Sequence, residues 1–142
     1  MTIKADKGFT FIETIVTISI ILVLSAAVGF SAVKYIERAQ IAACRNQIEI
    51  LRLALQSYFL DCGQYPTEIQ GLQSLWEKPV HPPVPSRWDG PYLDRQIPKD
   101  PWGNDYVYKN PGEKKMPFSI MSYGADGKTG GEGPNADIYS WD

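Results

Sequence analysis

The chain has 142 residues and a formal net charge of −2, so it can hold at most one modest domain beyond any targeting or membrane segment. Its Lys and Arg residues are scattered and not interleaved with aromatic residues, which excludes nucleic acid as a partner. The hydrophobic content of 44% is normal for a folded domain, but most Gly and Pro residues follow Gly63, so the composition changes there.

An apolar segment comes first. From Phe9 to Val33 the only charged residue is Glu13, and about 20 apolar residues are enough for a helix to cross the hydrocarbon layer of a membrane. Lys4 and Lys7 precede this segment, whereas the charges that follow it are mixed in sign. The positive-inside bias therefore favours a cytoplasmic N-terminus with the bulk of the chain outside. No small-residue cleavage site follows the segment, so it differs from a conventional secretory signal.

The next segment has apolar or small residues at alternating intervals of three and four, which is typical of one face of a helix. These residues are Ile41, Cys44, Ile48, Leu51, Leu55, Tyr58 and Cys62. We expect one helix from about Thr10 to about Leu60, with Gly63 and Pro66 as its stop signal. Its first half is apolar on every face and needs lipid or other helices, while its second half needs a small domain against one face.

Turn-forming residues are dense after Gly63, so any strands there must be short. Tyr106 to Tyr108 and Phe118 to Tyr123 are the best strand candidates, with the connection around Pro111-Gly112. Ile69 to Trp76 is a candidate short helix. The expected fold class is α+β, in which a long N-terminal helix packs on a small antiparallel sheet with long loops.

Several single residues are expected to be structural. Cys44 and Cys62 lie about 27 Å apart along the predicted helix, too far for a disulfide within one chain. We expect buried free thiols, with a bond between chains or a redox role as the open alternatives. His81 lies in a Pro-rich loop without a partner nucleophile, and Trp102 and Tyr106 are expected core anchors. The sequence has no phosphate loop, zinc spacing or nucleophile elbow, so we predict no catalytic residue and no enzyme.

Four blocks of sequence carry a family resemblance. The block from Gly8 to Glu13, GFTFIE, is similar to the processing motif of the type IV pilin-like family. The blocks Tyr65 to Leu72, Asp100 to Tyr106 and Ser122 to Gly127 then follow in the order found in the major pseudopilins of bacterial type II secretion systems. The resemblance covers nearly the whole chain, and it implies a pilin-like fold.

This resemblance implies a processing step at the start of the chain. A prepilin peptidase would cut between Gly8 and Phe9, which removes residues 1–8 as a leader peptide, and Phe9 would then be N-methylated. Glu13 would act in assembly by pairing with the Phe9 ammonium of a neighbouring subunit. The alternative is a Glu that is favoured by the helix macrodipole and reaches to the lipid headgroups.

The resemblance also implies a structural function. Residues 9–33 would form the transmembrane and filament-core helix, and residues 34–142 the amphipathic helix with a periplasmic globular domain. The subunit would wait in the inner membrane, single-pass with its N-terminus in the cytoplasm, and polymerise into a pseudopilus that drives folded proteins across the outer membrane. Its partners would be further copies, minor pseudopilins, inner-membrane assembly proteins and the prepilin peptidase. The alternatives are the major subunit of a type IV pilus, or a single-pass anchored binding domain or hydrolase.

Calcium is the cofactor that the resemblance implies. In the family, the loop that corresponds to Tyr123 to Asp137 binds the ion through carboxylates and backbone carbonyls, the ligands that a hard cation prefers. Asp126 and Asp137 correspond to carboxylate ligands. The carbonyls of Tyr123 and Lys128 correspond to carbonyl ligands.

This loop departs from the family pattern at several positions. Ala136 offers no side-chain ligand, and Gly131 replaces a hydroxyl ligand, so Asn135 or Glu132 would have to compensate. The alternative is a Gly-rich turn in which Asp126 caps its own backbone.

Overall fold

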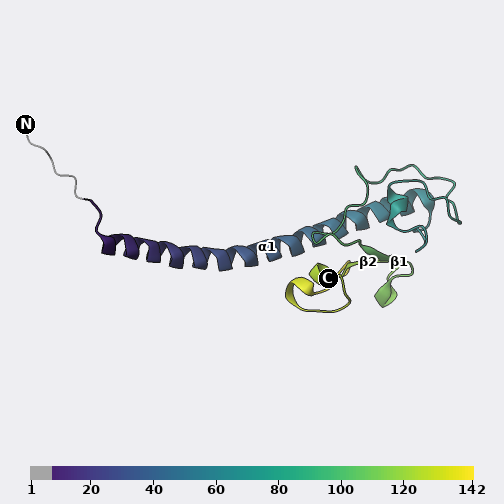
Figure 1. Cartoon of the computed structure of the whole chain (residues 1–142). Helices are drawn as coiled ribbons and strands as arrows, with labels where there is room; N and C mark the ends of the chain where they lie inside the picture. Colours follow the sequence, from purple (N-terminus) through teal and green to yellow (C-terminus); the bar gives the residue numbers. More distant parts are fainter. Residues whose placement is uncertain (1–7) are drawn as a thin grey trace, which may run out of the picture. The chain divides into compact units, whose positions relative to one another are not determined.

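A single long helix dominates the secondary structure. The computed structural model describes residues 8–142, in two units: the described residues up to Glu37, and Arg38–Asp142. Helix α1 (Phe11–Cys62) contains 52 residues and runs through both (Figure 1). This confirms the helix predicted from the apolar periodicity.

The helix ends where its sequence predicts. Gly63 adopts a φ of +75°, in the left-handed region that glycine enters at little cost, and its N–H donates to the Phe59 carbonyl at 2.8 Å. Pro66 follows and cannot continue the helix because it has no N–H.

A small antiparallel sheet lies beside the second half of α1 (Figure 1). Its strands, in spatial order, are β1 (Val107–Lys109), β2 (Ser119–Ser122) and β3 (Ile138–Tyr139). Tyr108 lies opposite Ile120, and Ser122 lies opposite Ile138. The first two strands agree with the predicted ones to within about one residue, while the third was not predicted.

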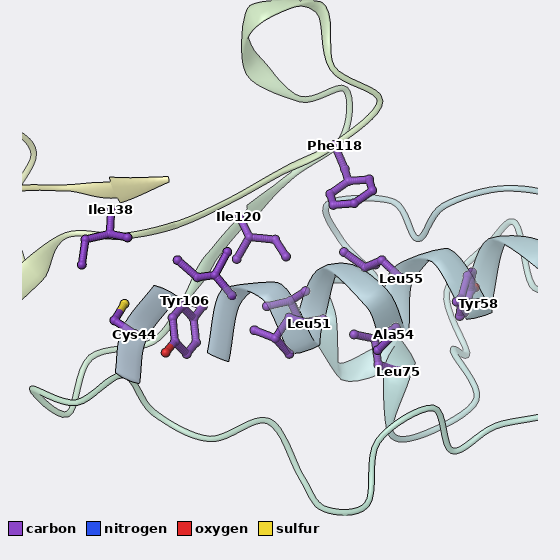
Figure 2. Close-up of a cluster of buried hydrophobic side chains, with 12 residues drawn as sticks. Cys44, Leu51, Ala54, Leu55, Tyr58, Leu75, Tyr106, Phe118, Ile120 and Ile138 are labelled. Carbon is purple, nitrogen blue, oxygen red and sulfur yellow. The ribbon is translucent and has the colours of Figure 1, made fainter. Parts of the chain in front are cut away.

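The core lies between α1 and this sheet. Figure 2 shows Leu51 and Leu55 of α1 on the side of the helix that faces Ile120 and Phe118. Leu51, Leu55 and Ile120 are each 0% exposed, and burying such a side chain contributes about 1.5–3 kcal/mol. The predicted apolar stripe is therefore confirmed, from Cys44 through Tyr58 as fully buried positions. The expected anchors behave differently, since Tyr106 is buried and Trp102 is only half-buried against the core.

Short 3₁₀ turns connect the remaining parts. They are η1 (Leu72–Leu75), η2 (Glu113–Lys115), η3 (Gly124–Asp126) and η4 (Gly133–Asn135). The candidate helix from Ile69 to Trp76 is thus reduced to η1, because Gly71 takes a φ of +60° with an extended ψ. Gln70, just before it, is buried and donates to the carbonyls of His81 and Pro83 at 2.6 and 2.9 Å, which ties the Pro-rich loop to η1.

Candidate functional site

The predicted processing junction lies immediately before α1. Gly8 and Phe9 precede the helix, and the Phe9 side chain is 83% exposed. The Thr10 hydroxyl accepts a hydrogen bond from the Glu13 N–H at 3.2 Å, and the Glu13 carboxylate accepts one from the Thr10 N–H at 3.5 Å. This reciprocal pair is a capping box, with Thr10 at the N-cap. The residues before Gly8, which include Lys4 and Lys7, lie outside the described part of the chain.

The capping box gives Glu13 a role within its own subunit. Its carboxylate lies in the first turn, where the partial positive charge of the helix N-terminus stabilises an anion. The alternative interpretation of Glu13 as a macrodipole-stabilised residue therefore has direct support, and the sequence pattern Thr-x-x-Glu could have predicted it. A capped carboxylate still remains exposed and able to meet a cation.

The first half of α1 is apolar on all sides. Among the described residues, α1 is the helix that is long and apolar enough to cross a membrane, by length and composition. The Thr17 and Ser19 hydroxyls are satisfied within the helix, since they donate to the carbonyls of Glu13 and Ile15 at 2.7 and 2.8 Å. Such hydroxyls add little cost in lipid, because their hydrogen bonds stay within the helix.

The C-terminal loop folds back on itself, so that η3 packs against η4. Gly124 has a φ of +62°, and a Cβ there would lie 2.8 Å from the Ala136 carbonyl oxygen. Gly131 has a φ of +101°, and a Cβ there would lie 2.5 Å from the Asn135 carbonyl oxygen. The loop therefore closes only because these two positions carry no side chain.

The two predicted carboxylate ligands have different environments. Asp126 is exposed, and its Oδ1 accepts from the Lys128 N–H at 3.0 Å, which is the backbone cap of the alternative interpretation. Asp137 is half-buried, and its Oδ2 accepts from the Gly130 N–H and from the Tyr139 hydroxyl, both at 2.9 Å. Within residues 8–142, the Asp137 Oδ1 atom is buried and has no hydrogen-bond partner. A buried carboxylate oxygen without a partner fits a cation ligand, because such an atom otherwise carries an uncompensated desolvation cost.

The other predicted ligands belong to the same loop. Tyr123 directly precedes η3, Lys128 follows it, and Asn135 ends η4 with its side chain exposed. In the described part of the chain, no group of three or more His, Cys, Asp or Glu side chains is gathered to hold a metal. A cation in this loop would therefore need backbone carbonyls beside the carboxylates, as the sequence resemblance implies.

A buried network of hydrogen bonds holds the start of the C-terminal loop at Gly124. Asp100 is 4% exposed, and its Oδ1 accepts from the N–H groups of Trp102 and Asn104 at 3.0 and 2.7 Å, which closes a turn there. Its Oδ2 accepts from the Ser122 hydroxyl at 2.6 Å. Ser122 Oγ in turn accepts from the Gly124 N–H, and the Asn104 amide donates to the Gly124 carbonyl at 3.0 Å.

Sequence reasoning missed three residues of this site, namely Asn104, Ser122 and Tyr139. Asn104 and Ser122 lie inside sequence blocks that resemble the family. The resemblance drew attention to these positions but did not predict their hydrogen bonds. The hydrogen bond to Asp137 raises the pKa of Tyr139 to about 12, with burial as a smaller cause. The position of Tyr139, two residues after the predicted ligand Asp137, was the one available signal in the sequence.

The remaining candidates lie outside these regions. Both cysteines are free, Cys44 fully buried and Cys62 half-buried, so the expectation of a buried thiol holds fully for Cys44 only. The Cys62 thiol donates to the Arg87 carbonyl at 3.3 Å. His81 is exposed in its loop, as expected.

The chain is similar to known proteins over nearly its whole length. The family model described as type II secretion system protein G matches residues 31–141, and the model described as the prokaryotic N-terminal methylation motif matches residues 3–29. The chain is 39% identical to the type II secretion system core protein G of Pseudomonas aeruginosa, over 98% of this chain and 97% of that protein. It is 40% identical to the core protein G of Vibrio cholerae, over 97% and 93% of the two chains.

A solved structure is similar as well. The crystal structure of the major pseudopilin from the type 2 secretion system of enterohaemorrhagic Escherichia coli matches with a TM-score of 0.63 and 38% identity. The match covers 73% of this chain and 88% of that one, so the similarity extends from sequence to fold.

Proposed function

Because the chain belongs to the type II secretion system protein G family, we propose that its exposed N-terminal junction is processed for assembly and that its C-terminal loop binds calcium. The chain is a subunit of the type II secretion pseudopilus with the pilin-like fold of a major pseudopilin. The family is structural, which agrees with the expectation that the subunit is not an enzyme. The comparisons favour this function over a type IV pilus subunit or an anchored binding domain.

Processing is supported by the position of the junction. The bond between Gly8 and Phe9 lies before the first turn of α1, and both residues are exposed, so a peptidase can reach it without unwinding the helix. Cleavage leaves Phe9 with an ammonium group that N-methylation retains as a cation. Gly8 lies in open space, because a Cβ there would contact nothing within 4 Å, so the residue before the bond leaves room for a peptidase.

Assembly follows from the charges that processing creates. The Phe9 ammonium and the Glu13 carboxylate have opposite charges, and each would be costly in lipid without a partner. In a filament the Glu13 of one subunit pairs with the Phe9 ammonium of its neighbour, which sets the register between stacked helices. Before assembly, the Thr10 cap holds the carboxylate at the helix end.

The mechanism is mechanical. Subunits are held in the inner membrane by residues 9–33, with a cytoplasmic N-terminus and the domain from residue 34 onward in the periplasm. Filament growth, with minor pseudopilins and inner-membrane assembly proteins as partners, pushes folded cargo outward. The exposed apolar half of α1 supports this arrangement, because its side chains need lipid before assembly and neighbouring helices after it.

Calcium binding is supported chiefly by Asp137. Its buried Oδ1, which has no partner among the described residues, gains a compensating charge if a cation binds there. Asp126, the carbonyls of Tyr123 and Lys128, and the side chain of Asn135 would complete the ligands. Bound calcium would supply charge neutralisation and a crosslink between the two ends of the loop.

Mass spectrometry and N-terminal sequencing test the processing step. We expect the protein recovered from membranes, after co-expression with a prepilin peptidase, to begin at Phe9 and to be heavier by one methyl group than the unmethylated chain. Expression without the peptidase is the control and should give a chain that begins at Met1. A chain that still begins at Met1 when the peptidase is present would reduce α1 to a membrane anchor.

Thermal unfolding in calcium and in chelator tests the loop. We expect Asp126→Ala to lower the unfolding midpoint much more in calcium than in chelator, because in chelator only the exposed hydrogen bond from the Lys128 N–H is lost. Asp105→Ala is a matched control, since its carboxylate is exposed and, among the described residues, pairs only with Lys99. Equal shifts of the Asp126 variant in both conditions would refute the calcium assignment.

A further inference from the structure

The Tyr139 hydroxyl fixes one side of the Asp137 carboxylate. It donates to Asp137 Oδ2 at 2.9 Å, and the Gly130 N–H donates to the same oxygen at 2.9 Å. A carboxylate oxygen has two lone pairs, so two donors saturate Oδ2. Across the described residues, the other oxygen, Oδ1, is buried and accepts nothing. The carboxylate therefore has one oxygen, Oδ2, that accepts two hydrogen bonds and one oxygen, Oδ1, that is free to bind a cation.

The Tyr139 ring is positioned by contacts that do not involve Asp137. Its backbone pairs with Met121 in the sheet, and its N–H donates to the Asp142 carboxylate at 3.0 Å. Its ring stacks on Trp141 with centroids 4.6 Å apart and an interplanar angle of 13°. The Lys114 ammonium lies 4.8 Å from the centre of the Trp141 ring and covers this pair from the loop between β1 and β2. The sheet pairing and the ring stacking thus hold the Tyr139 hydroxyl in position without help from Asp137.

We propose that Tyr139 is a positioning residue for the cation site, whose hydroxyl orients the Asp137 carboxylate so that Oδ1 stays available to a divalent cation. This inference rests on the calcium binding proposed above. A ligating carboxylate commonly receives a hydrogen bond from a residue behind it, and removal of that partner typically costs 10–100-fold in metal affinity. Without the hydroxyl, the carboxylate can rotate and exchange its two oxygens, which adds an ordering cost to binding.

Tyr139→Phe isolates the hydroxyl, because the variant keeps the backbone pairing of β3 and the stacking on Trp141. Calcium affinity is measured by calorimetry on the full chain in detergent, with calcium chloride as the titrant. We expect the variant to bind calcium about tenfold more weakly than the wild type, while its unfolding midpoint in chelator falls no further than that of Tyr108→Phe. Tyr108→Phe is the matched control, since its hydroxyl donates to the Pro66 carbonyl at 2.8 Å, outside the loop. That variant should lose stability and keep its calcium affinity.

A spectroscopic readout separates positioning from a general loss of stability. Calcium at Asp137 withdraws charge from Oδ2, so the near-ultraviolet difference spectrum of the wild type should show a perturbed tyrosine that Tyr139→Phe lacks. Equal affinity of Tyr139→Phe and wild type would overturn the inference and leave calcium binding intact. A lower affinity that comes with an equally lower midpoint in chelator, and with no tyrosine signal in the wild type, would also overturn it. A wild type that binds no calcium would refute both proposals.

Discussion

The Cys44 thiol is enclosed between α1 and the sheet, with 0% of the residue exposed. Burial raises the pKa of this thiol above its ordinary value, because a thiolate there would lose its hydration. The folded state therefore prefers the protonated thiol. The stability that this preference contributes is fully present below the ordinary value of 9.0 and is lost as the pH rises through the higher pKa of the folded state.

We predict that iodoacetamide modifies Cys62 before Cys44 in the folded chain. Burial also raises the pKa of Cys62, but this residue is only half-buried and its thiol reaches the surface near Arg87. Cys44 should react only in the small population of opened chains, so its rate follows the free energy of unfolding and rises with pH as the exposed thiol ionises. Peptide mapping by mass spectrometry gives both rates. Equal rates for the two thiols in the folded protein would show that the core around Cys44 opens readily.

At the scale of elements, the second half of α1 supplies a matched pair of leucines. Leu51 is 0% exposed in the core, whereas Leu53, two residues later, is 50% exposed. We predict that Leu51→Ala lowers the free energy of unfolding by about 2–5 kcal/mol, because it removes buried contacts and leaves a cavity. Leu53→Ala should change it by less than about 1 kcal/mol.

Denaturant unfolding of the two variants in detergent measures this difference. Both substitutions remove the same atoms from the same helix, so helix propensity changes equally and only burial differs. Similar losses for both variants would mean that the exposed face of α1 is covered in the measured state, for example by self-association. Unfolding measured at several protein concentrations separates self-association, which depends on concentration, from a wrong assignment of the core, which does not.

The elements that the sequence predicted best are those with long regular patterns. Helix α1 was placed to within about two residues, because its apolar stripe repeats over many turns and Gly63 ends it clearly. Strand β3 was missed because two residues carry no detectable alternation. The helix expected from Ile69 to Trp76 is present only as the short turn η1, because Gly71 adopts a backbone conformation that a helix does not allow.

The candidate site was predictable in its positions and less so in its contacts. Glu13, Asp126 and Asp137 were predicted through the resemblance, but the hydrogen-bond partners of the two Asp residues depend on loop geometry that residue types alone do not determine. Asp137 differs from Asp126 because Gly130 and Tyr139 are brought to it by the closed loop, which depends on Gly131 being free of a Cβ. Long-range closure of this kind leaves no periodic signal in the sequence.

At the scale of the whole molecule, Glu13 has one observed role and one proposed role, and the two are separable. Within the subunit it completes the capping box with Thr10. In the filament, as proposed above, it would pair with the Phe9 ammonium of a neighbour. A Gln at the same position can still accept the Thr10 hydrogen bond but carries no charge. Conversely, Thr10→Ala removes the hydroxyl of the cap and keeps the charge.

We predict that Glu13→Gln is cleaved and inserted into the membrane but assembles poorly, because an unpaired ammonium in a filament core costs about 3–5 kcal/mol per subunit. Thr10→Ala should weaken the start of the helix by about 1 kcal/mol and assemble much better than Glu13→Gln. Electron microscopy of sheared filaments, with immunoblotting of the membrane fraction as the control for insertion, measures both. Normal filaments from Glu13→Gln would remove the pairing argument, whereas equal defects in the two variants would assign the effect to the cap. Only a defect specific to the charge supports Glu13 as the residue that sets the filament register.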